Sequence, residues 1–145
     1  MKNRVDNHIQ CVVHGLVVYK TKVLVYSVED QIRKKTFFRL IGGHIDFGEE
    51  ASDALIREFK EEINEDIKIV EQLDVFENLF FYKEGKQHEF VSLFKIEFCN
   101  KKMYSKKDII GNEGPDRCYK ANWISIDEFK NKNKVLYPPN IVRYL

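Results

Sequence analysis

The sequence predicts a mixed α/β layered domain that takes up residues 1–145. Three observations lead to this prediction: several segments rich in Val, Ile and aromatic residues, one strongly amphipathic helix between them, and a length of 145 residues that suits one domain. Hydrophobic residues make up 43% of the chain, which is enough for one sizeable core, and no repeat or Pro/Gly/Ser-rich linker divides it.

The first third of the chain contains segments rich in β-branched residues, which predict strands. A tight turn separates the first two segments, and a charged loop over residues 29–35 precedes the third. The predicted strands cover residues 8–19, 23–28 and 36–41.

A helix is predicted over residues 51–63. Apolar residues recur there every four positions and form one stripe: Ala51, Leu55, Phe59 and Ile63. Glu58, Glu61 and Glu62 lie at positions i, i+3 and i+4, so their side chains project from one neighbouring face. Glu62 lies nearest to the apolar stripe, and we expect it to be partly buried.

The rest of the chain contains further strands and two short helical segments. The strand over residues 89–98 carries apolar side chains on both faces, which is typical of a central strand. Ser125 or Asp127 is expected to cap the first short helix. The remaining predictions are one or two strands over 66–81, a turn at 83–86, a loop over 101–120, a short strand over 121–126, and short helices over 127–132 and after Pro138-Pro139.

Charge and cysteine content exclude several classes of protein. The 24 basic and 23 acidic residues give a net charge of +1, so nothing draws the chain in general to a nucleic acid polymer or an anionic membrane. The three cysteines show no C-x-x-C spacing, which argues against a disulfide framework or a zinc cluster and fits a reducing compartment. No segment resembles a signal peptide or a membrane span, so we expect a cytoplasmic protein.

The acidic face of the predicted helix has two interpretations. Exposed like-charge pairs on a helix cost only about 0.2–0.5 kcal/mol each, so a solvated acidic surface is one of them. The other is a magnesium site, because Mg²⁺ prefers oxygen ligands and needs few carboxylates when substrate phosphates complete its shell. The loop before the helix adds to the second interpretation: Gly42 and Gly43 allow close approach of the backbone to a ligand, and Asp46 and Glu49 add acid nearby.

The spacing of these residues resembles a known family motif. Gly43 is followed after five residues by Glu49, and after seven more by Arg57-Glu58, an apolar residue, any residue, and Glu61-Glu62. This resembles the Nudix box, G-x5-E-x7-R-E-U-x-E-E-x-G-U, in which U is bulky and apolar. A weaker likeness to a Nudix subgroup with the pattern E-N-x-F…G…H-E covers residues 77–89.

Two positions depart from the box. Asn64 stands where the family has glycine, and Glu65 where it has an apolar residue. Asparagine tolerates the left-handed conformation that a helix C-terminus needs, so Asn64 is a mild change. We expect Ile67 to supply the apolar packing in place of Glu65.

The resemblance implies a fold and a reaction. The fold would be a Nudix-type α/β/α sandwich with a mixed β-sheet and a loop–helix–loop catalytic motif, and residues 1–145 would form a single Nudix (MutT-like) hydrolase domain. The reaction would be hydrolysis of a phosphoanhydride (pyrophosphate) bond in a nucleoside diphosphate linked to another moiety, as in a nucleotide pyrophosphatase. Mg²⁺ would be the cofactor, with Mn²⁺ as a substitute, and the partner would be a small nucleotide-like molecule. A homodimer is compatible with the sequence but is not specified by it.

The resemblance also assigns roles to residues. Glu58, Glu61 and Glu62 would be catalytic metal ligands, with a backbone carbonyl of Gly42 or Gly43 as a further ligand. Arg57 and Glu49 would form an ion pair that, together with Gly43, supports the site. The general base is left open between Glu89, at the start of a predicted strand, and Glu113 in the following loop.

Several residues keep two interpretations. His44 and His88 flank acidic groups and either contact phosphate or make ordinary hydrogen bonds. The aromatic residues 80–82 either stack on a base or belong to the core.

Two other functions compete with hydrolysis. One is a catalytically inactive Nudix-like domain that binds a nucleotide as a sensor, although a pure binder does not need three carboxylates. The other is an unrelated acidic-helix protein that binds calcium or nothing, although no D-x-D-x-D-G loop is present. The leaving group stays open among ADP-ribose, nucleotide sugars, dinucleoside polyphosphates and oxidised nucleoside triphosphates, because loops outside the box determine specificity.

Overall fold

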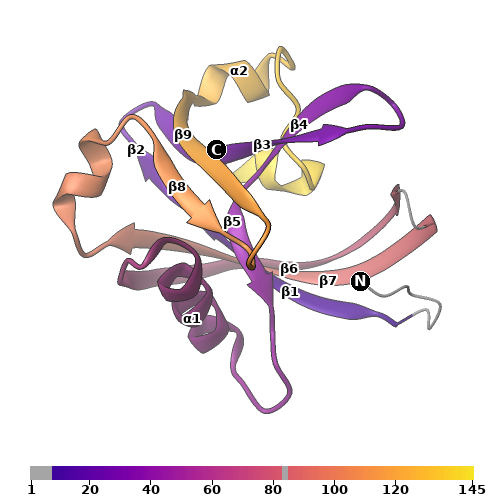
Figure 1. The fold of residues 1–145 in the computed structure, drawn as a ribbon, viewed down its shortest axis with the longest axis horizontal. Coiled ribbons are helices and arrows are strands. Elements are labelled where there is room, and N and C mark those ends of the chain that lie inside the picture. The colour runs from indigo at the N-terminus through magenta and orange to yellow at the C-terminus, as the bar shows by residue number, and fades with distance from the viewer. Residues whose placement is uncertain (1–7, 83–84) are drawn as a thin grey trace.

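The computed structural model describes residues 8–82 and 85–145, in which two β-sheets pack face to face with helices outside them (Figure 1). The strands are β1 (Gln10–Leu16), β2 (Val18–Tyr19), β3 (Lys22–Asp30), β4 (Lys35–Arg39), β5 (Ile41–His44), β6 (Ile67–Tyr82), β7 (Gly85–Phe98), β8 (Ile109–Asn112) and β9 (Cys118–Ser125). The helices are α1 (Ala51–Ile63), α2 (Ile126–Lys130) and the 3₁₀ segments η1 (Lys101–Ser105) and η2 (Pro139–Tyr144).

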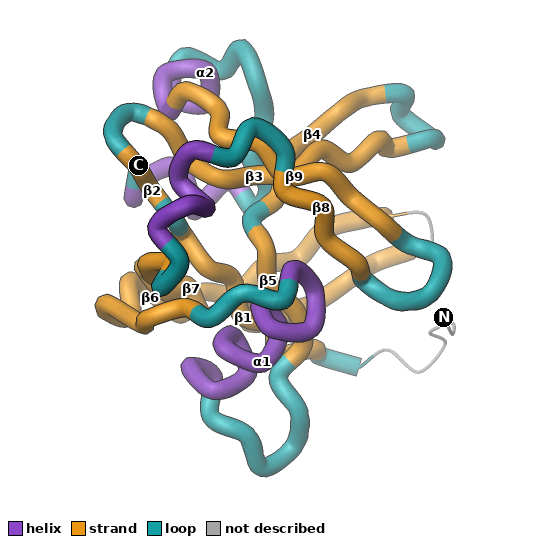
Figure 2. Tube along the Cα trace, turned by 60° about the vertical axis from the view of Figure 1, so that its left-hand side comes forward, coloured by secondary structure: helices purple, strands orange, loops and turns teal. Residues whose placement is uncertain are grey.

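The two sheets differ in strand direction. The four-stranded sheet has the order β5-β1-β7-β6, and its central pair β1 and β7 is parallel, while its other pairs are antiparallel. The second sheet has the order β2-β3-β9-β8, with β4 also paired to β3, and is antiparallel. Figure 2 shows the second sheet above the first, with α1 below. This arrangement confirms the predicted mixed α/β fold with a mixed sheet.

Helix α1 begins and ends at the predicted residues. Leu55 and Phe59 are fully buried against the four-stranded sheet, as the apolar stripe requires. Gly15 of β1 makes room for this packing, because a Cβ there would lie 2.8 Å from the Phe59 ring. Asn64 ends the helix in the left-handed conformation (φ 55°, ψ 41°), and Ile67 is buried in the same core, so both departures from the box are accommodated.

A second apolar cluster lies toward the C-terminal end of the fold. It contains residues from both sheets and from the segments around α2 and η2: Leu16, Val23, Val25, Leu40, Leu93, Phe129, Leu136 and Ile141. Helix α2 covers Ile126–Lys130 where 127–132 was predicted, and Ser125, one of the two predicted caps, occupies its N-cap position without a side-chain capping hydrogen bond. The predicted helical segment after Pro138 is η2.

The structure corrects the prediction of one strand over residues 8–19. The chain leaves the first sheet after Leu16 and enters the second at Val18, so this segment forms β1 and β2. Strand β3 therefore pairs with β2 and not with β1. The Val17 carbonyl accepts a hydrogen bond from the Leu24 backbone (3.1 Å), which accompanies the crossing. An uninterrupted apolar run does not reveal such a change of sheet.

The prediction of a loop over residues 101–120 is also wrong in part. This segment contains η1 and the edge strand β8, in which Ile109 and Gly111 face inward and the residues between and after them face outward. Four residues are too few for that alternation to stand out from the polar surroundings. Strands β6 and β7 extend further toward each other than predicted, while residues 83–84 of the predicted turn lie outside the described residues.

No helix in the described ranges is long and apolar enough to cross a membrane.

Candidate active site

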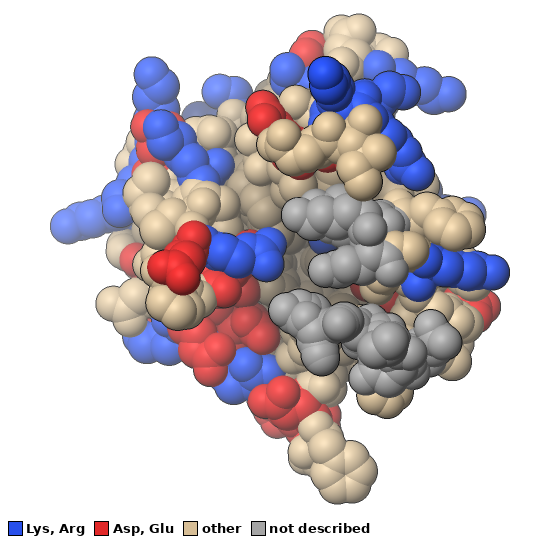
Figure 3. Space-filling model, turned by 45° about the vertical axis from the view of Figure 1, so that its right-hand side comes forward, with Lys and Arg blue, Asp and Glu red and all other residues tan. Residues whose placement is uncertain are grey.

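A cavity of about 1040 Å³ lies between the two sheets, where β5 passes α1. Its lining comes from α1, from the inner face of the four-stranded sheet, from β3 and β4, and from the connection between β8 and β9. In Figure 3 a group of acidic side chains lies beside a hollow in the surface. The three glutamates of α1 belong to the lining of this cavity.

The α1 glutamates differ in exposure. Glu62 is buried, as expected from its place beside the apolar stripe, with only 6% of its surface exposed. The side chain of Glu58 is 14% exposed and that of Glu61 is 59% exposed. The Glu58 carboxyl group lies directly over Gly43, where an added Cβ would come within 2.2 Å of its carboxyl carbon. Only glycine at position 43 therefore leaves this space to the carboxylate.

Arg57 joins the loop to the helix. Its guanidinium donates to both carboxylate oxygens of Glu49 (2.8 and 2.9 Å) and to the His44 backbone carbonyl (3.0 Å). It also donates to Glu58 and to Glu61, each at 3.2 Å. The Arg57 hydrogen bonds, with a further bond from the Asp46 backbone N–H, lower the pKa of Glu49 to about 2. A single planar fork thus holds the loop against two carboxylates of the helix.

Tyr119 of β9 contacts the deepest of the three glutamates. Its hydroxyl donates to Glu62 Oε1 at 2.7 Å, and its ring stacks on Tyr26 with 4.2 Å between centroids. Gly111 makes room for the ring, since a Cβ there would lie 2.1 Å from it. Burial raises the pKa of Glu62 to about 9, against the opposing effect of the Tyr119 bond and with a further increase from nearby Glu58. Tyr119 was not predicted as a site residue, because it lies in a segment that was predicted to be a loop.

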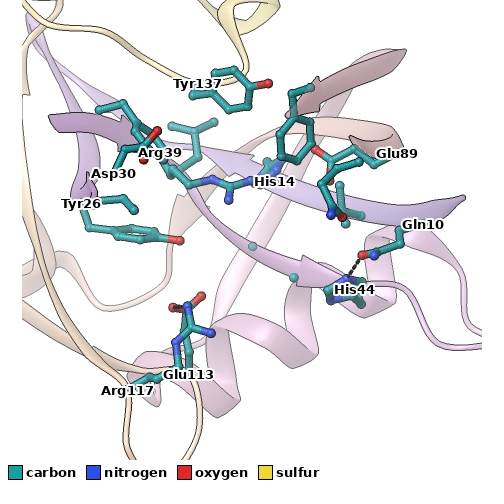
Figure 4. A pocket seen from close by; sticks show the side chains of 18 of the residues that line it. Gln10, His14, Tyr26, Asp30, Arg39, His44, Glu89, Glu113, Arg117 and Tyr137 are labelled. Atoms are coloured by element: carbon teal, nitrogen blue, oxygen red, sulfur yellow. Dashed lines mark hydrogen bonds and ion pairs between the residues drawn. The ribbon is translucent and has the colours of Figure 1, made fainter. Parts of the chain in front are cut away.

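Glu89 faces the cavity from the four-stranded sheet (Figure 4). It lies inside β7, which begins at Gly85, and not at the strand end where we expected it. The strand register places Asn78 on one side of it and Gln10 on the other. Asn78 donates to Glu89 Oε1 at 3.1 Å, and Glu89 is only 7% exposed. It is therefore a buried carboxylate of the cavity wall and not a surface residue.

The two predicted histidines have different surroundings. His44 lines the cavity, and its Nε2 lies 2.5 Å from Gln10 Oε1. His88 is not part of the cavity lining, and its Nε2 lies 2.6 Å from Glu77 Oε2. Strand alternation explains the difference, because His88 and its neighbour Glu89 point to opposite faces of β7.

The remaining predicted residues whose side chains the structure describes also line the cavity. Phe80 is half-buried and packs edge-on against Tyr137, with 5.4 Å between centroids. Phe81 lines the cavity but is 62% exposed, and the side chain of Tyr82 lies outside the described residues. Glu113, in the β8–β9 connection, lines the cavity and lies 3.7 Å from Arg117.

The donor groups of α1 are compatible with magnesium. Within residues 8–82 and 85–145, no three carboxylate, imidazole or thiol side chains gather tightly enough to hold an ion by themselves. Mg²⁺ at phosphate-processing sites is commonly bound by one or two carboxylates, with water and substrate phosphates completing the octahedron. Glu58 and Glu62 both line the cavity, and Glu58 lies against the Gly43 backbone, so this donor set fits such an ion.

Comparisons with known proteins agree on one family. The model described as NUDIX domain matches residues 11–145. The fold is shared with the E. coli ORF135 protein (16% identity, 97% of this chain and 89% of that chain, TM-score 0.63) and with a MutT protein from Methanosarcina mazei Go1 (12% identity, 97% and 95%, TM-score 0.67). It is also shared with a UDP-X diphosphatase (16% identity, 94% of this chain and 59% of that chain, TM-score 0.58).

Because these sequence identities are low, the likeness to the solved structures shows the fold and no more. The family model carries the assignment, because it covers all but the first ten residues of the chain. Nudix hydrolases generally use divalent metal ions, and the family points to hydrolysis of a pyrophosphate bond. By this match, and by the fold that it shares with Nudix structures, the chain belongs to the Nudix family, which acts on small nucleotide-derived substrates.

Proposed function

We propose that this protein is a magnesium-dependent hydrolase that cleaves a phosphoanhydride bond in a nucleoside diphosphate linked to another moiety. The observation that carries the proposal is that Glu58 lies against the Gly43 backbone and shares one wall of a large cavity with Glu61 and Glu62. The opposite wall carries aromatic and polar side chains, so the cavity can accept a substrate with a charged and an uncharged part. A UDP-X diphosphatase shares this fold, so nucleoside diphosphates linked to another group are the first substrates to test.

Glu58, Glu61 and Glu62 would hold the ion, with the Gly42 carbonyl as a further oxygen ligand. When bound, Mg²⁺ (or Mn²⁺) neutralises phosphate charge, orients the substrate and lowers the pKa of a bound water. Glu62 is suited to bind a cation because its buried carboxylate lacks a positive partner within the described residues. Glu61 is the most exposed of the three and would exchange its hydrogen bond from Arg57 for the ion.

Arg57, Glu49 and Gly43 would support the site without touching the reacting atoms. The Arg57 fork fixes the loop to the helix through Glu49 and orients Glu58. Gly43 keeps the space that the Glu58 carboxylate occupies. Replacement of any of these three should therefore act through the geometry of the site.

Glu89 is our candidate for the general base. One of its oxygens accepts a hydrogen bond from Asn78, while Oε2 makes no hydrogen bond to any described residue. The carboxylate lies in the cavity wall, where it can take a proton from water during attack on phosphorus. Comparing pH–rate profiles of Glu89→Gln and wild type tests this role, and identical profiles would remove Glu89 from the mechanism.

A substrate panel tests the proposed function. ADP-ribose, nucleotide sugars, dinucleoside polyphosphates and oxidised nucleoside triphosphates are incubated with Mg²⁺, with and without chelator, and phosphate-containing products are measured. We expect hydrolysis that the chelator abolishes and that is lost in Glu61→Gln and in Glu62→Gln. Glu65→Gln, just beyond α1 and away from the cavity lining, is the matched control and should keep full turnover.

The panel also distinguishes the alternative functions. Unchanged turnover in both Glu61→Gln and Glu62→Gln would defeat the metal-ligand assignment. Tight binding of a nucleotide without any hydrolysis would favour the sensor domain instead. If no compound of the panel is bound or hydrolysed, the acidic helix is only a solvated surface.

A further inference from the structure

Two side chains in the cavity wall carry buried nitrogens that lack a hydrogen-bond partner among the described residues. His14 of β1 lines the cavity, follows two buried valines in its strand and is only 5% exposed. Neither of its ring nitrogens has a hydrogen-bond partner in the described part of the chain. Burial, followed by the positive charge of Arg39, lowers the pKa of His14 to about 3, against the opposing effect of the nearby Leu40 backbone.

Arg39, the last residue of β4, lies beside His14. Figure 4 shows its guanidinium ending next to the imidazole, below Tyr137 and on the far side of the cavity from Glu113 and Arg117. Its Nε is buried and has no hydrogen-bond partner among residues 8–82 and 85–145. The other arginines of the cavity lining behave differently, because Arg33 lies 3.8 Å from Asp30 and Arg117 lies 3.7 Å from Glu113. Arg39 has no such ion pair to any described carboxylate.

A ligand of defined chemistry would satisfy both side chains. A buried donor without an acceptor is costly, and a half-buried guanidinium without an ion pair favours a negative charge nearby. A phosphate group offers several acceptor oxygens and the charge, in a geometry that a guanidinium fork matches. A neutral imidazole N–H adds a further donor without adding another charge.

We propose that Arg39 and His14 form a phosphate-binding subsite in the cavity, separate from the carboxylates of α1. Phosphate binding there requires no metal. That the bound phosphate belongs to the substrate rests on the proposed function, and it would be a phosphate other than the groups bridged by the ion. The α1 glutamates on one side of the cavity can then bind phosphate only through a cation. Arg39 and His14 on the other side can bind phosphate directly.

The test is a titration of the full-length protein with inorganic phosphate in the presence of chelator, with acetate as the control anion. The affinity and the ¹H–¹⁵N resonance of the Arg39 Nε–H, identified by its absence in Arg39→Gln, are followed together. We expect this resonance to shift and saturate with phosphate but not with acetate. We expect the dissociation constant to rise about tenfold or more in Arg39→Gln, because one charged hydrogen-bonding group is lost.

Arg33→Gln is the matched control, since it removes the same charge from the same cavity lining but from a residue already paired with Asp30. Its dissociation constant should stay within about twofold of wild type. A wild-type Arg39 resonance that does not respond to phosphate, or equal affinities in Arg39→Gln and wild type, would overturn the subsite. If Arg39→Gln fails to fold, Arg39→Lys, which keeps the charge but has no Nε–H of a guanidinium, identifies the resonance by its absence, and the wild-type response to phosphate then decides.

Failure of this inference and failure of the proposed function are distinguishable. Metal-free phosphate binding at Arg39 without hydrolysis of any panel substrate refutes the enzyme and keeps the subsite. Magnesium-dependent hydrolysis without a phosphate response at Arg39 refutes the subsite and keeps the enzyme.

Discussion

Removing the Tyr119 hydroxyl should weaken magnesium binding more than it weakens the fold. Tyr119 donates one hydrogen bond, of 2.7 Å, to Glu62 Oε1, and Tyr119→Phe deletes that bond while the ring and its stacking on Tyr26 remain. Without metal, burial holds the pKa of Glu62 at about 9, so the carboxyl is protonated at pH 7. Bound metal requires the carboxylate form.

The size of the effect on stability follows from the two forms of Glu62, the neutral carboxyl without metal and the carboxylate with metal. A hydrogen bond between neutral groups contributes about 0.5–1.5 kcal/mol, and one to a charged group about 1.5–3 kcal/mol. Tyr119→Phe should therefore lower the free energy of unfolding by the smaller amount in chelator and by the larger amount at saturating Mg²⁺. The difference of roughly 1.4 kcal/mol corresponds to about a tenfold rise in the Mg²⁺ concentration for half-maximal activity.

Urea unfolding at pH 7, with chelator and with saturating Mg²⁺, measures both losses, and a Mg²⁺ titration of activity measures the shift. Tyr26→Phe is the matched control, because Tyr26 stacks on Tyr119 while the bond to Glu62 is retained. Equal losses with and without Mg²⁺, together with an unchanged half-saturation, would refute the idea that Tyr119 positions a metal ligand.

Three further perturbations test other parts of the site. Gly43→Ala places a Cβ within 2.2 Å of the Glu58 carboxyl carbon and should lower turnover about tenfold or more, so wild-type kinetics would contradict the close approach. Arg57→Lys keeps the positive charge but loses the planar fork that binds Glu49. We expect kcat to fall while circular dichroism shows a retained fold. An unchanged kcat would show that the fork is dispensable. In chelator, the raised pKa of Glu62 means that wild type loses stability as pH rises from about 4.5 to about 9, whereas Glu62→Gln does not. Melting temperatures should therefore diverge in favour of Glu62→Gln toward pH 9, and a pH-independent difference would count against a buried carboxylate.

The helix and its loop were predictable from the sequence because their determinants are local. The apolar stripe and the carboxylates of α1 repeat within four residues, so one helical period places them all. Asn64 could also be read locally, since its left-handed conformation depends on its own backbone.

The far wall of the cavity could not be predicted in the same way. The Tyr119 hydroxyl donates to Glu62 although the two residues are 57 positions apart in the sequence. Arg39 lies beside His14 because β4 and β1 belong to facing sheets. Such meetings depend on which strands pair and in what register, and a single sequence does not state either. Of these residues, only His14 can be recognised in the sequence, as a polar residue that follows two valines in a predicted strand.

The passage of the chain from one sheet to the other at Val17 could not be predicted from the sequence either. Residues 10–19 look like one β segment, yet they belong to two sheets. The roles of Glu58, Glu61, Glu62 and Glu89 stay predictions, since geometry brings them to the cavity without showing what they do there.

The proposed function depends on a divalent ion held between α1 and the glycine pair of β5. Adding Mn²⁺ to ¹⁵N-labelled protein tests this directly, because the paramagnetic ion broadens amide resonances near it. We expect selective loss of the amide signals of Gly42, Gly43, Glu58 and Glu62, which excess Mg²⁺ reverses and which does not occur in Glu62→Gln. Sharp signals at these four residues in the presence of Mn²⁺ would contradict the proposed function.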